Sequence, residues 1–228
     1  MVLPLCKLEQ YQSFVSLLKP LYSFEIHFKP EMIDVHMLNG SNDVWTSIQY
    51  KTPIINPCSI CVDTNALTPV KGDVVDISID GNNLLFKTGK LTHKAPKLVD
   101  PNIPKKNKES INVSWDHIVV TLTNADLKDI ISMVDNKSKY DFILNEGVFT
   151  LKDISNDLVQ FDMPIEGADP TLQYISRFHG NNLVDVLFNT KHFTGCNVIF
   201  GSKCPVEFVY KCEWLDVVYL VAPLIEQE

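Results

Sequence analysis

The stretch from Ile118 to Ile154 reads IVVTLTNADLKDIISMVDNKSKYDFILNEGVFTLKDI and contains the unit from which the fold is predicted. It opens with a β-branched run, which favours a strand. Asn124 is able to cap a helix, and the apolar residues of 127–134 recur at the spacing of one helical face. The predicted order is strand (118–123), helix (124–134), strand (140–144), turn (145–147) and strand (148–151).

The same order of elements recurs in three other parts of the chain, without sequence identity between the copies. The first copy has a helical pattern at 8–18 and strand patterns at 24–28 and 32–35; the second has strands at 59–62, 74–79 and 84–86 with a short helix at 64–71; the fourth has a helix at 181–193 and strands at 197–200 and 206–210. Four units in two similar halves predict an α+β fold with antiparallel sheets and helices on one side.

Length and composition are those of a globular protein. With 228 residues, the chain is long enough for one large domain or two of ordinary size. Its 45% hydrophobic content is that of a protein with a full core. No apolar run reaches the ~18 residues of a membrane span, and residues 1–6 lack the basic start of a signal peptide. We therefore expect an intracellular protein without membrane association, nuclear in a eukaryote or a nuclear virus and otherwise cytoplasmic.

A polar segment divides the chain near its middle. Residues 100–110 hold two prolines and three lysines without apolar periodicity, which is typical of a linker. Ile103 is its single large apolar side chain, and it is either simply exposed or an anchor for something that docks beside the linker. We expect an N-terminal domain at 1–99, a connector at 100–112 and a C-terminal domain at 113–228.

The charge pattern limits the kinds of nucleic-acid contact that are expected. The formal net charge is −8, which argues against a generally basic nucleic-acid binder. Arg177 is the only arginine among 20 basic residues. Because bidentate base reading favours arginine, sequence-specific DNA recognition is not expected. Lysines gathered on one surface remain compatible with phosphate contact, although an AT-rich genome would also explain the lysine excess.

Motifs for catalysis and metal binding are missing from the sequence. It contains no phosphate-binding glycine loop, no nucleophile elbow and no HExxH pair, so we expect neither enzyme activity nor a cofactor. Cys58 and Cys61 form a lone CxxC. A zinc site needs a second ligand pair, which Cys196, Cys204 and Cys212 supply only if the two halves meet there. We expect reduced thiols and no metal.

The six histidines are scattered along the chain. His27, His36 and His117 alternate with apolar residues, which is typical of strand side chains. His179 precedes a glycine and is expected in a turn. His192 is expected at the end of a helix, where a cation suits the helix dipole. No two of them indicate a catalytic pair.

The C-terminal sequence VVYLVAPLIEQE (217–228) resembles the closing strand and acidic tail of sliding clamps of the proliferating cell nuclear antigen family. The resemblance extends through 204–211 and, in order, to 172–175 and 197–200, while 102–104 is similar to the connector between the two clamp domains. Each clamp domain holds two of the units described above. The resemblance implies a two-domain clamp fold, with antiparallel sheets outside and two helices per domain lining a ring.

The resemblance implies a protein without catalytic activity. Such a protein is a DNA sliding clamp and polymerase processivity factor, which encircles duplex DNA and tethers replication and repair proteins. It implies a homotrimer that a clamp-loader ATPase places on DNA. The implied protein partners are a DNA polymerase and other proteins that carry a short clamp-binding peptide.

Three sets of site residues follow from the resemblance. Basic side chains on or beside the helices are expected to face DNA in the channel: Lys19, Lys71, Lys128, Lys137, Lys139, Arg177 and Lys191. A groove between the connector and the C-terminal strand is expected to take the partner peptide: Val44, Ile103, Pro104, Pro205, Ala222, Pro223 and Ile225. Edge strands near 91–99 and 158–165 are expected to pair between subunits through Leu91, Leu98, Leu158, Phe161 and Ile165.

Two alternatives keep the fold and change its use. Aspartates at 126, 129, 135 and 185 lie on or beside the predicted helices and weaken the positive field that DNA needs. The chain is then either a checkpoint-type or viral clamp-like subunit of a heteromeric ring without a replicative role, or a clamp-fold interaction protein that does not bind DNA.

Overall fold

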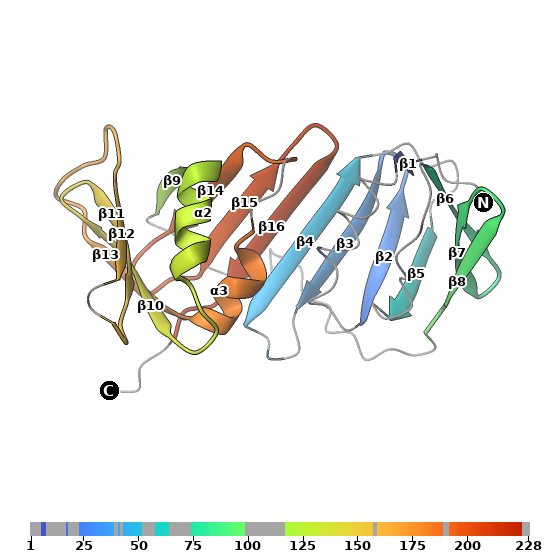
Figure 1. The fold of residues 1–228 in the computed structure, drawn as a ribbon, viewed down its shortest axis with the longest axis horizontal. Coiled ribbons are helices and arrows are strands. Elements are labelled where there is room, and N and C mark those ends of the chain that lie inside the picture. The colour runs from blue at the N-terminus through green and yellow to red at the C-terminus, as the bar shows by residue number, and fades with distance from the viewer. Residues whose placement is uncertain are drawn as a thin grey trace. The chain divides into compact units, whose positions relative to one another are not determined.

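The computed structural model describes residues 6–7, 17, 23–38, 41, 43–51, 58–63, 74–98, 117–156, 159–188 and 192–224 (Figure 1). The chain divides into two compact units. Unit 1 comprises 1–39, 46–107 and 213–216, and unit 2 comprises 40–45, 108–212 and 217–228. The predicted connector and the predicted helix at 64–71 lie outside the described residues. Of the helical pattern at 8–18, only Leu17 is described, and it is helical and buried.

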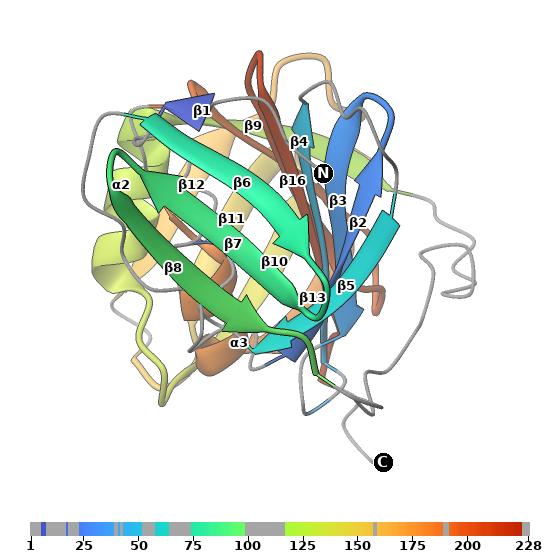
Figure 2. The ribbon, with the colours of Figure 1, turned by 90° about the vertical axis from the view of Figure 1, so that its right-hand side faces the viewer.

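Unit 1 is built from strands. They are β1 (Cys6–Lys7), β2 (Ser23–Lys29), β3 (Met32–Leu38), β4 (Val44–Lys51), β5 (Cys58–Asp63), β6 (Val74–Asp80), β7 (Asn83–Thr88) and β8 (Leu91–Pro96). The strands β5-β2-β3-β4 are neighbours in that order within one sheet, with β4 belonging to unit 1 from Thr46 onward, and a second sheet has the order β1-β6-β7-β8. Figure 2 shows β6, β7 and β8 side by side. The hairpins β2–β3 and β6–β7 confirm the strand pairs predicted in the first two copies.

The core of unit 1 follows from the alternation of side chains along β2. Phe24, Ile26 and Phe28 are at most 3% exposed, and they point to one face of the sheet. The residues between them, Glu25 and His27, are polar and lie on the opposite face. β2 is hydrogen-bonded to β3 on one side and to β5 on the other, so it is an inner strand of its sheet and both of its edges are paired.

Unit 2 contains α2 and α3, the two helices whose bounds the structure describes. Its elements are β9 (Ile118–Thr123), α2 (Asn124–Met133), β10 (Lys139–Asn145), β11 (Val148–Asp153), β12 (Gln160–Pro164), β13 (Tyr174–His179), α3 (Gly180–Val186), β14 (Gly195–Phe200), β15 (Val206–Lys211) and β16 (Leu215–Val221). The sheet orders are β12-β11-β10-β13 and β16-β15-β14-β9. Figure 1 shows α2 and α3 on one face of the second sheet. The order predicted for 118–154 is confirmed.

The N-terminus of α2 differs in detail from the prediction. Its cap is Thr123 rather than Asn124. The Thr123 hydroxyl accepts a hydrogen bond from the backbone N–H of Asp126 at 3.3 Å, and the Asp126 carboxylate accepts one from the Thr123 N–H at 2.8 Å. This reciprocal pair is a capping box. Asn124 is the first helical residue, and its side-chain amide donates instead to the Phe193 carbonyl at 2.8 Å.

The helix predicted at 181–193 is shorter in the structure. α3 ends at Val186, because the backbone at Leu187 is extended, with φ −88° and ψ 116°. Phe188 then stacks on Tyr210, with ring centroids 4.1 Å apart, and the Tyr210 hydroxyl donates to the Val186 carbonyl at 3.0 Å. Aromatic packing therefore outweighs helical propensity in this segment.

Two histidine placements differ from the prediction. His192 lies in a turn after α3, so the expectation that it ends a helix is wrong. His179 was expected in a turn, but it is the last residue of β13 and the N-cap of α3. Gly180 follows directly as the first helical residue, which leaves no room for a separate turn.

An aromatic cluster forms the core of unit 2. Phe142 makes edge-to-face contacts, at centroid distances of 5.1–6.1 Å, with Phe149, Phe178, Phe200 and Phe208. Such pairs contribute roughly 0.5–1.5 kcal/mol each beyond burial. At the edge of the second sheet, β14 approaches β9 so closely that a Cβ on Gly195 would lie 2.1 Å from the Leu122 carbonyl oxygen, so only glycine fits there.

Candidate functional site

The described part of the predicted peptide groove lies within unit 2. Val44 is buried, and Pro205, Ala222 and Pro223 are half-buried. The Ala222 N–H donates to the Asp43 carbonyl at 2.7 Å, which places the segment 222–223 beside Val44. The other predicted groove residues, Ile103, Pro104 and Ile225, lie outside the described residues.

Strand β13 holds the two segments that carry the groove prolines. The Leu224 N–H donates to the Arg177 carbonyl at 2.7 Å, and the Cys204 N–H donates to the Ser176 hydroxyl at 3.2 Å. Cys204 precedes Pro205, and Leu224 follows Pro223. Since Ser176 and Arg177 are consecutive residues of β13, both prolines lie near the same part of this strand. The structure therefore gathers the described groove residues in one region of unit 2.

The predicted DNA-facing residues fall in different kinds of element. Lys128 is exposed on α2, Lys137 is exposed between α2 and β10, and Lys139 is exposed at the start of β10. Arg177 lies on β13, not on a helix, and its guanidinium binds the Asp141 carboxylate through two hydrogen bonds of 2.7 and 2.9 Å. That ion pair offsets its charge. Lys19, Lys71 and Lys191 lie outside the described residues.

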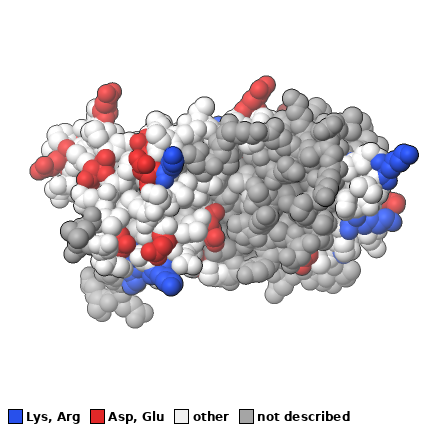
Figure 3. All heavy atoms as spheres, in the orientation of Figure 1, with Lys and Arg blue, Asp and Glu red and all other residues white. Residues whose placement is uncertain are grey.

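The two helices carry more negative than positive charge. Asp126, Asp129 and Asp185 are set against Lys128 alone. Figure 3 shows the same balance, with more red than blue over the region of α2 and α3. This face does not have the basic character that a phosphate-contacting surface usually has.

The predicted subunit contacts map to edge strands. Leu91 is 58% exposed on β8, which ends one sheet of unit 1. Phe161 is half-buried on β12, which ends one sheet of unit 2, and it packs against Phe149. Leu98 and Ile165 are half-buried just beyond these strands. Leu158 lies outside the described residues.

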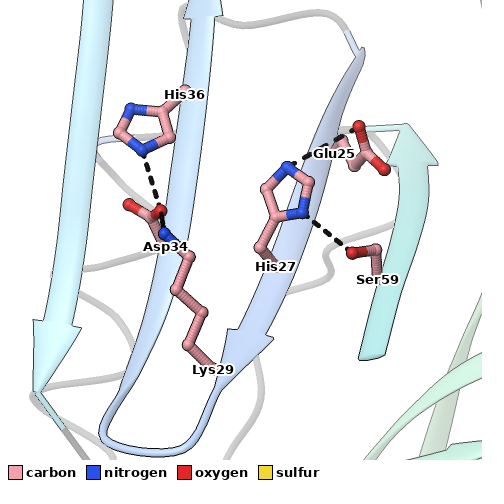
Figure 4. A network of polar contacts seen from close by, with 6 residues as sticks. All are labelled: Glu25, His27, Lys29, Asp34, His36 and Ser59. Carbon is pink, nitrogen blue, oxygen red and sulfur yellow. Dashed lines mark hydrogen bonds and ion pairs between the residues drawn. The ribbon is translucent and has the colours of Figure 1, made fainter. Parts of the chain in front are cut away.

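A network of polar side chains in unit 1 was not predicted from the sequence. Asp34 on β3 is fully buried, and its Oδ2 accepts hydrogen bonds from Lys29 and, at 2.8 Å, from His36 (Figure 4). Burial by itself raises the pKa of the Asp34 carboxyl, but the hydrogen bonds and charges of His36 and Lys29 outweigh it and hold that pKa below its ordinary value. Asp34 is therefore ionised at neutral pH.

A second arrangement in Figure 4 brings a serine, a histidine and a carboxylate together. His27 Nδ1 and the Ser59 hydroxyl are 2.8 Å apart, and His27 Nε2 is 3.6 Å from the Glu25 carboxylate. The second distance exceeds that of a hydrogen bond, so Glu25 does not orient the ring as the acid of a catalytic triad does. We interpret the His27–Ser59 contact as a cross-strand pair that supports the β2–β5 ladder, and Glu25 as a neighbour of His27 on the same strand.

Another candidate chemical group is the buried thiol of Cys196. Burial raises the pKa of the Cys196 thiol to about 12, so it is a neutral thiol and not a nucleophile. It lies under a hollow of about 220 Å³ on β9, β14 and β15 that is lined by Thr121, Asn197 and Lys211, among others.

Within the described ranges, no three acidic, histidine or cysteine side chains are grouped to hold a metal, and no helix is long and apolar enough to cross a membrane.

This chain is similar in fold to several solved structures, and the similarity extends over its whole length. The chain is similar to the A. fulgidus PCNA in a structure with the C-terminal region of FEN-1, with 15% identity, a TM-score of 0.76 and 100% of both chains covered. It is also similar to a chain of the PCNA2–PCNA3 complex from Sulfolobus tokodaii, with 15% identity, a TM-score of 0.77 and 99% and 100% coverage. For PCNA from Thermococcus kodakaraensis the identity is 18%, the TM-score 0.76 and the coverage 98% and 100%.

The chain therefore has the PCNA sliding-clamp fold, as the sequence resemblance implied. No protein-family sequence model matches it, and no curated protein matches it in sequence. At 15–18% identity, the likeness between these structures and this chain is one of fold.

Proposed function

We propose that this protein is a DNA sliding clamp that raises polymerase processivity and performs no chemistry. The observation that carries the proposal is the agreement of fold over the full length of both chains, at TM-scores of 0.76–0.77 with three PCNA structures. A shared fold alone does not fix function, but a ring-forming fold retained over its whole length is suited to one mechanical task. The proposed assembly is a closed ring of three chains around duplex DNA.

The physical benefit of such a ring is topological. A polymerase that holds a ring on DNA cannot diffuse away after each dissociation, so its effective concentration at the primer end stays high. The ring must slide, and contacts to the phosphate backbone allow this because they carry no sequence information. A net charge of −8 and a single arginine fit weak, non-specific contact.

The proposed protein partners carry a short clamp-binding peptide. One of the similar structures holds the C-terminal region of FEN-1 on PCNA, and another is a PCNA2–PCNA3 complex. By analogy, we assign the peptide to the groove of Val44, Pro205, Ala222 and Pro223 together with the connector. Proline in the segment 222–224 supplies no N–H there, which leaves an apolar shelf for an aromatic or branched side chain of the peptide.

A primed circular DNA tests the clamp function. Polymerase product length is measured with and without this protein and a clamp-loader ATPase. A sliding clamp lengthens the products of a single binding event on circular DNA, and it loses this effect when the DNA is linear and the ring can slide off. Products of equal length with and without the protein, with several polymerases, would contradict the proposal.

Peptide binding is expected to depend on the groove. A fluorescent C-terminal peptide of a polymerase is titrated with the wild type and with Ile103→Ala/Pro223→Ala. We expect the double variant to lose most of its affinity, since apolar anchors carry most of the energy of such interfaces. Equal affinity of the two proteins would remove the groove assignment, provided that both form the same ring by sedimentation.

The acidic helices favour one alternative function, a clamp-fold interaction protein without DNA in its ring. The two functions differ in the circular-DNA experiment. A protein of the alternative kind binds the peptide but leaves product length unchanged. A subunit of a heteromeric ring would instead stay monomeric alone and stimulate the polymerase only after its partner chains are added.

A further inference from the structure

The charges on the helices of unit 2 raise the question of where this unit meets DNA. Asp129 and Asp185 are exposed on α2 and α3, and Lys128 is next to Asp129 in sequence. Phosphate groups are repelled by the aspartates, and Lys128 barely offsets them. The helical face is therefore a poor phosphate-binding surface.

Positive charge is instead concentrated where α2 ends. Lys137 and Lys139 are both exposed in the segment that leads from α2 into β10. Lys139 is directly opposite His179 in the β10–β13 pairing, and His179 is exposed as well. Three side chains that donate hydrogen bonds to anions thus lie in one place, which we name the basic turn (Lys137, Lys139 and His179).

The basic turn is held by well-formed hydrogen bonds. The Asp135 carboxylate accepts hydrogen bonds from the N–H groups of Lys137 and Ser138 at 2.7 and 2.8 Å. These bonds lower the pKa of Asp135 and turn its charge toward the backbone. The Tyr140 hydroxyl accepts from the Asp135 N–H at 2.9 Å and donates to the Met133 carbonyl at 3.0 Å. The turn therefore has its own internal support.

A contact with α3 fixes the turn beside His179. The Gly180 N–H donates to the Ser138 carbonyl at 2.9 Å. A Cβ at position 180 would lie 1.9 Å from the Asp135 carbonyl oxygen, so the turn packs against this residue only because it is glycine. The backbone of the basic turn consequently keeps a defined position relative to the start of α3, so less backbone entropy is lost on binding.

We propose that unit 2 contacts the phosphate backbone of duplex DNA through the basic turn and not through the exposed faces of α2 and α3. This inference rests on the proposed clamp function. Lys128 and Arg177 are left out of the contact, the first because the aspartates of α2 and α3 outnumber it and the second because Asp141 holds its guanidinium. His179 is a contact residue that the sequence did not indicate.

The salt dependence of DNA association tests this assignment. The fluorescence anisotropy of a short labelled duplex is titrated with the full chain at several salt concentrations. Each lost phosphate contact lowers the log–log slope by about 0.9, so Lys137→Ala/Lys139→Ala is expected to lower it by about 1.8. His179→Ala is expected to weaken binding as well, since it removes the third hydrogen-bond donor of the basic turn.

Matched variants separate a contact from a general effect of charge. Lys203→Ala/Lys211→Ala removes two other exposed lysines of unit 2, and Lys128→Ala removes the helical one; neither is expected to change the slope. Lys137→Arg/Lys139→Arg is expected to keep it. Thermal unfolding of each variant shows whether the fold is intact.

The outcomes distinguish this inference from the clamp function. If the wild type stimulates the polymerase and Lys137→Ala/Lys139→Ala keeps the full slope, the basic turn is not the contact and only the inference is overturned. If Lys128→Ala lowers the slope instead, the helical face is the contact. If the wild type shows neither salt-dependent association nor stimulation, both proposals are overturned.

Discussion

Asp34 is a charged side chain that is fully buried. Its Oδ2 is bonded to Lys29 and His36, while its Oδ1 is buried without a hydrogen-bond partner among the described residues. Removing one partner of a buried, hydrogen-bonded charge pair is costly because the other charge stays behind. In this case both partners are partly exposed, with side-chain exposures of 49% for Lys29 and 32% for His36, so water compensates part of the loss.

We predict that Asp34→Asn lowers the free energy of unfolding by about 2 kcal/mol at neutral pH, within the range for hydrogen bonds to charged groups. Because the pKa of Asp34 is lowered in the folded protein, its contribution is fully present above the ordinary value of 3.8 and is lost as pH falls through the folded value. Urea unfolding at several pH values checks this. The difference between the two proteins should shrink in acid.

An exposed carboxylate provides the control for Asp34. Glu31 lies in the turn between β2 and β3 and is exposed, so Glu31→Gln should leave the unfolding free energy nearly unchanged. If Asp34→Asn is as stable as Glu31→Gln at neutral pH, the Asp34 network does not stabilise the fold.

Part of this network could be predicted from the sequence. His36 and Asp34 are two residues apart in a stretch of strand-like alternation, so they are expected to share a face. The hairpin 24–35 also brings Lys29 near Asp34. The burial of Asp34 could not be predicted, because it depends on what covers the sheet. The prediction of His27 and His36 as strand side chains is confirmed, whereas their hydrogen-bond partners were missed.

At the scale of a single element, the stability of helix α2 depends on its capping box. We predict that Thr123→Ala lowers the unfolding free energy by about 1 kcal/mol, because the N–H of Asp126 then loses its acceptor. Chemical denaturation of the wild type and the variant measures the change. Ser132→Ala, exposed on the same helix, should be neutral; an equally large loss in that variant would point to a general effect of helix substitution.

The elements predicted correctly are those that residues close together in the sequence specify, through apolar alternation and turn residues. The hairpin 140–151 has apolar alternation and an Asn-Glu-Gly turn, and Glu146 and Gly147 both have positive φ there. β4 and β13 were missed, because their buried polar residues interrupt the apolar pattern. In β13, Ser176 is buried and donates to the Gly201 carbonyl at 2.8 Å, which no local rule predicts. α3 was predicted too long because Phe188 was counted as helical.

At the scale of the whole molecule, we predict that the wild type is a trimer. Leu91→Asp is expected to be monomeric. Leu91 is 58% exposed on the edge strand β8, where a charge would oppose pairing with a strand of the next chain. Sedimentation velocity at working concentration measures the change. Because Leu91 is not part of the core, the fold of the variant should be unaffected.

Two further variants complete the assembly experiment. Val119→Asp introduces the same charge at an exposed valine, 46% accessible on β9 and away from the predicted seam, and should remain trimeric. Phe161→Asp should also give monomers, although its contact with Phe149 makes a loss of stability an added effect. A wild type that forms a stable dimer would contradict the trimer.

Gly180 and Gly195 have a consequence for how far this sequence can diverge. At both positions any side chain would collide with a backbone carbonyl oxygen, of Asp135 and of Leu122 respectively. A carbonyl oxygen of the main chain is present whatever residue bears it, so no compensating substitution nearby restores the space. Within this chain, a side chain at either position therefore requires the main chain of α3 or of β14 to move away from its neighbour.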